Sequence, residues 1–261
     1  MSEREKILRY YRASGDEAGA AKLLDLGESA IRYRRYKVSD FLDPYLYSIA
    51  ETIAAHYDQL QLLAQGGYHG AERVKAAFID LSFPGKVDFA IAALRIDWDS
   101  RYYQLSHRDV LGALLGLGLK REIIGDLIMN QSGCQVILDT TMAAFVVQNL
   151  STVGSAPVSV TTIALEEIAA REEKIKDIKT TVASLRLDVV AAAGFGTSRT
   201  KMADEIMADK VKVNWQSIKN SSQLLKIGDV ISMRGRGRVE VCDVLGQTKK
   251  GRTSVCLKRF I

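Results

Sequence analysis

The chain has few of the side chains from which cofactor, metal and disulfide sites are most often built, with three cysteines and three histidines in 261 residues. Cys134, Cys242 and Cys256 are odd in number and include no Cys-x-x-Cys pair, which argues against a disulfide framework and against a zinc site. We expect Cys242 and Cys256 to be reduced residues of a core. His56 and His69 are isolated, so the sequence predicts no metal site and no cofactor.

Long apolar runs are also missing. No run approaches the ~18 residues that a membrane-spanning helix needs, and the charged start of the chain lacks the apolar core of a signal peptide. We therefore expect no membrane insertion and a cytoplasmic location. Hydrophobic residues make up 47% of the chain and charged residues 26%, a composition typical of a soluble protein with two or three domains.

The segments that are similar to catalytic motifs lack the partner residues or the position that the chemistry requires. His107-Arg108-Asp109 is similar to a kinase catalytic loop, but the Asn expected five residues after the Asp is Leu114, and no Asp-Phe-Gly accompanies it. Three glycines between residues 112 and 118 lie within or at the end of a predicted helix, where they cannot open a dinucleotide-binding loop. The sequence thus indicates no catalytic residues, and we expect a protein that is not an enzyme.

What the sequence does have is basic charge concentrated at one end. Residues 183–261 contain 15 Lys and Arg against 7 Asp and Glu, a net charge of +8, whereas residues 1–182 carry a net charge of −3. Such asymmetry favours a module that faces a polyanion, attached to a domain with another task.

The basic segment begins with two predicted helices. Leu185 to Ala193 presents one apolar helical face, which Gly194 is expected to end. Ser198 is a good N-cap for a second helix, whose buried stripe would be Met202, Ala203, Ile206 and Met207. Arg199, Thr200 and Lys201 then lie in the first turn, where cations oppose the helix dipole. Because free N–H groups and two cations together make an anion site, we predict that this turn contacts nucleic-acid phosphate.

A short strand follows the second helix. Lys210-Val211-Lys212-Val213-Asn214 alternates with period two, so Val211 and Val213 should enter the core. Lys210, Lys212 and Asn214 would share the opposite face and flank the helix site.

This order of parts resembles the S-four (S4) RNA-binding domain over roughly residues 185 to 234. The resemblance rests on Arg186-Leu187-Asp188, Ser198-Arg199, Val211-Lys212-Val213-Asn214 and Gly228-Asp229-Val230-Ile231. It implies an RNA-binding role for Arg186 together with the residues above. Where the family usually has Gly after the Asn, this chain has Trp215, which either stacks on a base or packs on the small domain.

Two further basic clusters complete the predicted RNA site: Arg234, Arg236 and Arg238, and then Lys249, Lys250 and Arg252. Glycines between the cations would let them approach phosphates closely. If the first cluster projects from a glycine-spaced strand and the second from a neighbouring hairpin tip, the two could clamp one RNA feature. The alternative for the second cluster is a solvated hairpin tip.

The sequence predicts an α+β fold. Residues 1–80 are expected to be mainly helical, with helices over Lys6 to Tyr11, Glu17 to Leu26 and Pro44 to Leu63. Residues 82–163 follow the order β-α-β-β-α-β of ferredoxin-like and RNA-recognition folds, although the aromatic residues that stack on RNA in the latter are not evident. Residues 164–182 would be a charged connector, and 183–261 the S4 domain with a basic extension.

Across nearly its whole length the chain resembles the YlmH family, through segments that include Lys37 to Pro44, Gly66-Gly67-Tyr68, Leu105 to Gly112 and Thr248 to Arg252. The resemblance implies a non-catalytic RNA-binding protein that docks on rRNA or tRNA of the large ribosomal subunit, in quality control or assembly. One branch is called photosystem II S-four domain protein, and an older label is cell division. An RNA-modifying enzyme and a protein-binding assembly factor stay open as alternatives. RNA is the expected partner, and a monomer is favoured.

Overall fold

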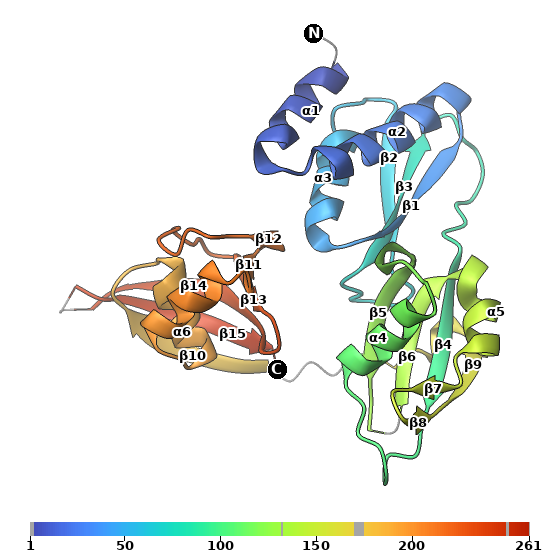
Figure 1. Ribbon diagram of the computed structural model, residues 1–261. Helices are drawn as coiled ribbons and strands as arrows, with labels where there is room; N and C mark the ends of the chain where they lie inside the picture. The colour runs from blue at the N-terminus through green and yellow to red at the C-terminus, as the bar shows by residue number, and fades with distance from the viewer. Residues whose placement is uncertain (1–2, 132, 170–174, 249–250, 261) are drawn as a thin grey trace. The chain divides into compact units, whose positions relative to one another are not determined.

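The computed structural model describes residues 3–131, 133–169, 175–248 and 251–260. The chain divides into two units, residues 1–171 and 172–261 (Figure 1). Helices and sheets are segregated rather than alternating along one parallel sheet, so the predicted α+β class is confirmed. In the part of the chain that the structure describes, no helix combines the length and the apolar character that crossing a bilayer requires.

The N-terminal part of the first unit packs helices on a three-stranded antiparallel sheet with strand order β1-β3-β2. Its elements are α1 (Glu3–Ser14), α2 (Glu17–Tyr33), β1 (Tyr36–Leu42), α3 (Pro44–Ala54), β2 (Leu60–Gln65) and β3 (Val74–Asp80). The expectation of a mainly helical region missed all three strands, and the helix predicted from Pro44 to Leu63 ends at Ala54. Strand β3 is buried along almost its whole length, so it lacks the period-two pattern that marks a half-buried strand.

The Asp43-Pro44 pair opens α3 as predicted. Asp43 accepts a hydrogen bond from the Leu46 amide (2.9 Å), and Pro44 occupies the first helical turn. Strand β1 ends immediately before this pair.

The middle part of the first unit has the predicted β-α-β-β-α-β order. Its elements are β4 (Ile91–Asp97), α4 (His107–Gly116), the 3-10 turn η1 (Arg121–Ile123), β5 (Ile124–Met129), β6 (Gly133–Asp139), α5 (Thr140–Asn149), the small hairpin β7 (Thr152–Val153) and β8 (Ala156–Pro157), β9 (Ser159–Ile163) and η2 (Leu165–Glu167). All strand pairs are antiparallel in the order β5-β6-β4-β9, which is the ferredoxin-like arrangement. Helices α4 and α5 cover one face of this sheet and bury Val110, Leu114 and Val146 against it.

The opposite face of the middle sheet is covered by the N-terminal part. Phe41 near the end of β1 packs with Ile128 and Ile137 of the sheet, and Tyr68, Ile91 and Ile168 pack against this cluster. A side chain at Gly125 would meet the Phe41 ring at 2.9 Å, so this glycine permits the close approach. The two parts therefore share a core.

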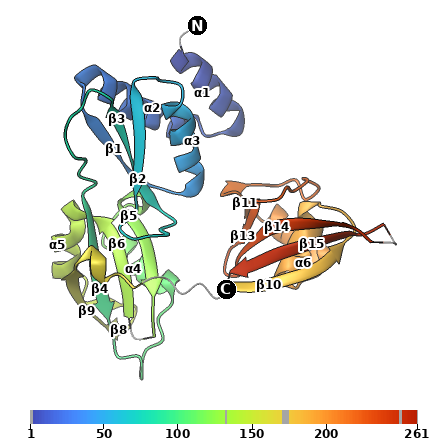
Figure 2. The same cartoon turned by 180° about the vertical axis from the view of Figure 1, so that it is seen from behind.

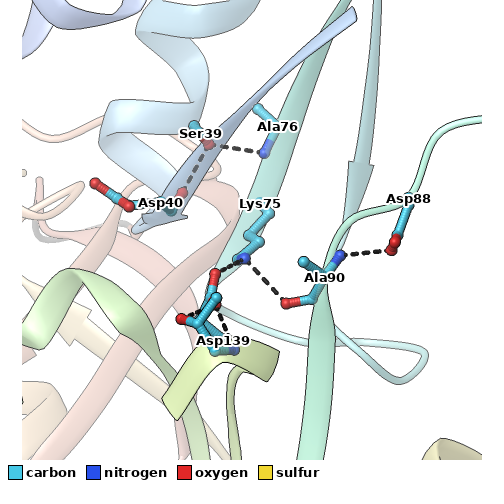
Figure 3. A network of polar contacts seen from close by, with 8 residues as sticks. Ser39, Asp40, Lys75, Ala76, Asp88, Ala90 and Asp139 are labelled. Atoms are coloured by element: carbon cyan, nitrogen blue, oxygen red, sulfur yellow. Dashed lines mark hydrogen bonds and ion pairs between the residues drawn. The ribbon is translucent and has the colours of Figure 1, made fainter.

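Polar contacts hold the same interface. Lys75 of β3 is buried, and its ammonium donates to the Asp139 carboxylate and to the Ala90 carbonyl (3.1 Å), as Figure 3 shows. Asp126 of β5 accepts from the Tyr68 hydroxyl (2.9 Å) and from the backbone amides of residues 72 and 73. Burial disfavours the charged form of Asp139, but the hydrogen bonds from Lys75 and Thr141 outweigh it and lower the pKa of Asp139.

The second unit is a six-stranded antiparallel sheet, in the order β10-β15-β14-β13-β11-β12, with two helices (Figures 1 and 2). Its elements are β10 (Ile175–Val182), α6 (Leu187–Phe195), α7 (Arg199–Met207), β11 (Val211–Val213), β12 (Gln216–Ser217), β13 (Val230–Met233), β14 (Gly237–Gln247) and β15 (Thr253–Phe260). Apolar residues of α6 and α7, among them Phe195 and Ile206, pack on the strands to form the core.

Two sequence predictions for this unit are wrong. Residues 175–182 are not part of a connector, because β10 pairs with β15 along its whole length. Helix α6 also continues through Gly194 and ends at Gly196, whose φ of +62° is the left-handed cap. Glycine at position 194 lets α6 pack closely on β14, since a Cβ atom there would lie 2.7 Å from the Val239 side chain.

Replacing Lys75 by Met should destabilise the first unit by about 2–3 kcal/mol, because the Asp139 carboxylate would lose its buried cation while most of the apolar stem of the side chain is kept. Urea unfolding followed by the fluorescence of buried Trp98, in a Trp215→Phe background, measures this. Lys22→Met is the matched control, since its pair with Asp40 is exposed and should contribute less than about 1 kcal/mol. Equal losses in the two variants would contradict the structural role assigned to Lys75.

Candidate nucleic-acid interface

A buried carboxylate joins the two helices of the second unit. The Asp188 side chain of α6 is 4% exposed and accepts two hydrogen bonds from Arg186 (3.1 and 3.0 Å) and one from Arg199 Nε (2.8 Å). Burial disfavours the Asp188 anion, but the hydrogen bonds from the two arginines prevail and lower its pKa. The carboxylate thus stays charged and orients two guanidinium groups.

Helix α7 begins as the sequence predicted. The Ser198 hydroxyl accepts from the Lys201 amide (3.2 Å), which makes Ser198 the N-cap, and Arg199, Thr200 and Lys201 are exposed in the first turn. Met202 and Ile206 are buried as expected, whereas Met207 is 66% exposed and does not belong to the buried stripe.

A second carboxylate, that of Glu205 farther along α7, interacts with several cations. Glu205 forms an ion pair with Lys210 (2.8 Å), and the positive charges of Lys201 and Arg236 also act on it. The hydrogen bond from Lys210, followed by these charges, lowers the pKa of Glu205. We call the residues around the two carboxylates the α7 basic surface: Arg186, Arg199, Lys201, Lys210 and Arg236. These five cations outnumber the four carboxylates of α6, α7 and the following turn, Asp188, Asp204, Glu205 and Asp209, so a net charge of +1 remains.

Strand β11 confirms part of its predicted pattern. Val211 and Val213 are buried, and Lys212 is exposed between them. Asn214, however, does not share a face with the lysines. Its φ is +49°, its side-chain amide donates to Asp229 (2.9 Å), and its side-chain carbonyl accepts from the Val230 amide (2.9 Å). Asn214 therefore bonds within the turn, and the expectation that it shares a face with the lysines is wrong, whereas its contact with RNA stays a prediction.

The first C-terminal basic cluster lies on a tight turn instead of a glycine-spaced strand. Met233 pairs with Gly237 across the β13–β14 hairpin, and φ is +77° at Gly235 and +81° at Gly237. These glycines serve the turn. Arg234 is exposed, whereas the Arg238 guanidinium stacks on the Phe260 ring at 4.5 Å from its centroid.

The predicted clamp is wrong, because the described members of the two clusters lie at opposite ends of β14. Arg234 and Arg236 precede this strand and Arg252 lies beyond its far end, so a strand of 11 residues, roughly 35 Å long, separates them. Arg252 is tied to β10, where it donates to the Thr181 hydroxyl (3.2 Å) and carbonyl (2.6 Å). Lys249 and Lys250 lie outside the described residues.

The sheet face of the middle part that its helices leave free is covered over parts of β5 and β6. An RNA-recognition motif presents aromatic side chains on the sheet face that its helices leave free. Here Phe41, Tyr68 and Ile168 cover that face over Ile128 and Ile137, and the Gln135 side chain bonds to the backbone of residues 167 and 169. The covering was not visible in the sequence, because it comes from segments outside the β-α-β-β-α-β pattern.

Comparison with known families divides the chain in three. Residues 15–80 match the model described as "YlmH, N-terminal", residues 84–167 match "Putative RNA-binding domain in YlmH", and residues 185–231 match the S4 domain. The S4 match contains α6, α7 and β11, and thus most of the α7 basic surface.

The relatives agree with these matches. The chain is 36% identical over 228 residues to the ribosome-associated protein quality control protein P2 of Bacillus subtilis (strain 168), covering 86% of this chain and 88% of that protein. A solved structure titled cell division protein ylmH, from Streptococcus pneumoniae, shares the fold with a TM-score of 0.51 at 20% identity, over 59% of this chain and 95% of the other. On the identity and coverage of the Bacillus relative, the chain belongs to the YlmH family.

Proposed function

We propose that the chain is a ribosome-associated, non-catalytic RNA-binding protein of the cytoplasm. In this proposal the second unit docks on structured rRNA or tRNA of the large ribosomal subunit through the α7 basic surface. The observation that carries it is the arrangement of Arg186 and Arg199 around buried Asp188 at the start of α7.

The geometry suits phosphate. The first backbone N–H groups of a helix have no intrahelical acceptor, and the helix dipole favours an anion at this end. Arg199 and Lys201 are exposed in this first turn, and Asp188 holds the planar forks of Arg186 and Arg199 in fixed orientations. A guanidinium that is already oriented loses less entropy when it binds phosphate, which favours a defined RNA structure over diffuse attraction.

The ribosomal part of the proposal is supported by the name of the Bacillus relative, which describes that protein as ribosome-associated. The non-catalytic part is supported by the sequence, in which no catalytic motif meets its required context. Links to photosystem II and to cell division stay predictions from the family resemblance.

Sedimentation of tagged protein through a sucrose gradient, followed by crosslink sequencing, tests the proposal as a whole. We expect cosedimentation with large subunits and crosslinks from the second unit to rRNA or tRNA. Recovery in protein-only fractions would contradict it.

Replacing both Arg199 and Lys201 by Ala should weaken binding to structured RNA whatever its sequence. The log–log salt dependence of the binding constant should flatten by up to about two, since each lost duplex phosphate contact removes about 0.9. Lys179→Ala with Lys258→Ala is the matched control, because it removes two exposed cations from strands β10 and β15 of the same unit. An equal change in the salt-dependence slope for the two double variants would show that the position of a cation within the second unit does not matter for binding.

Replacing Asp188 by Asn should weaken RNA binding although it adds positive charge. Asn cannot accept all three arginine hydrogen bonds, so Arg186 and Arg199 lose their orientation, and we expect roughly a tenfold loss, about 1.4 kcal/mol. Filter binding and a melting curve measure affinity and folding.

Glu205→Gln is the matched control for Asp188→Asn. It adds the same charge on the same surface, but the cations that it frees include two flexible lysines, so binding should be unchanged or tighter. Tighter binding by folded Asp188→Asn protein would mean that the surface acts through net charge alone.

A further inference from the structure

A tryptophan occupies a backbone position that suits glycine. Val213 pairs with Gln216 across the β11–β12 hairpin, which leaves Asn214 and Trp215 as a two-residue loop. Their φ angles are +49° and +64°. Positive φ at both central residues is the pattern of a type I′ turn, in which Asn followed by Gly is favoured. Trp215, unlike glycine, has a Cβ atom, so its backbone is strained in this left-handed conformation.

The surrounding hydrogen bonds prevent this turn from relaxing. The Asn214 backbone N–H donates to the Val230 carbonyl (2.8 Å), and its side-chain amide binds both Asp229 and the Val230 amide. Asp229 in turn accepts from the Lys226 amide (2.7 Å). The β11–β12 turn and the turn of residues 226–229 are thus one polar unit, which holds the backbone of Trp215 in place.

The indole does not contribute to the core of the second unit. Val211 and Val213 before the turn are buried in that core, and Ile218 after it packs against it. Among the described residues, Trp215 belongs neither to the core nor to the partly buried apolar residues packed on it, and it is half-exposed. Core packing therefore does not account for a strained tryptophan here, and persistent strain is a reason to look for a function.

The charges around the turn favour a nucleic-acid ligand. Lys212 lies three residues before Trp215 and Lys219 four residues after it, and both are exposed. Lys226 is exposed on the turn that is bonded to Asn214 through Asp229. The nearby carboxylate, Asp229, is occupied by Asn214 and the Lys226 amide. Lys210 of the α7 basic surface immediately precedes strand β11, roughly 16 Å from Trp215 along the chain.

We propose that Trp215 is a stacking platform for an unpaired nucleobase, with Lys212 and Lys226 beside the flanking phosphates. The inference rests on the proposed RNA-binding function and deepens it, because it assigns base contact to a loop or bulge next to the RNA segment that the α7 basic surface holds by its phosphates. Aromatic rings stack on splayed single-stranded bases but cannot reach bases that are stacked within a duplex.

Trp215→Gly separates stacking from structure, because the two roles predict changes of opposite sign. Glycine relieves the strain at φ +64°, so the melting temperature should stay the same or rise. Affinity for a hairpin RNA with a single-stranded loop should fall about tenfold, since the contact with one stacked base is lost, while affinity for a blunt duplex of equal length should not change. Trp215→Phe retains a ring and should keep most of the loop-RNA affinity.

Fluorescence gives a second readout. The chain has two tryptophans, and Trp98 is buried in the first unit. Loop RNA should therefore quench the emission of the parent protein but not that of Trp215→Gly.

The proposal is overturned if Trp215→Gly lowers the melting temperature and leaves loop-RNA binding unchanged, because Trp215 is then a packing residue. It is equally overturned if the variant loses association with ribosomal fractions while binding both RNAs like the parent, since the ring would then meet protein. The Arg199→Ala, Lys201→Ala protein should lose affinity for both RNAs. If the parent binds neither RNA, the proposed function itself fails, and this outcome is distinct from a failure of Trp215 alone.

Discussion

The buried Asp188 carboxylate is the constraint on which the second unit and its candidate interface both depend. A carboxylate that is 4% exposed must be paired, and its partners Arg186 and Arg199 stand at the beginnings of α6 and α7. The same hydrogen bonds that offset the burial of Asp188 fix the two guanidinium groups. One contact therefore both ties the starts of α6 and α7 together and shapes the basic surface.

A related constraint limits what the first unit can do. Lys75 and Asp126 are buried where the N-terminal part meets the middle sheet, and each is satisfied by groups from the other side. Because these contacts and Phe41 cover part of the sheet face that an RNA-recognition motif would use, Ile128 of β5 and Ile137 of β6 are committed to packing. The proposed function accordingly assigns phosphate contacts to the α7 basic surface of the second unit.

Local sequence patterns predicted the structure correctly where it depends on residues that are close together in the chain. Ser198 and Asp43 cap their helices by bonding to amides three residues away, and the alternation of Val211, Lys212 and Val213 needs a single sheet face. Strand β10 was missed because its partner β15 begins more than 70 residues later. Strand β3 was missed because burial on both faces removes the alternation that reveals a strand.

The sequence by itself determined the fold class, the ferredoxin-like order of the middle part, and the position of the exposed cations at the start of α7. Tertiary structure alone decided how those cations are used. It paired Arg199 with Asp188, turned the Asn214 amide to Asp229, and placed Arg236 and Arg252 beyond opposite ends of β14. The reason is physical: spacing along a chain sets which residues share a face, whereas the partner of a charge depends on which segments packing brings together.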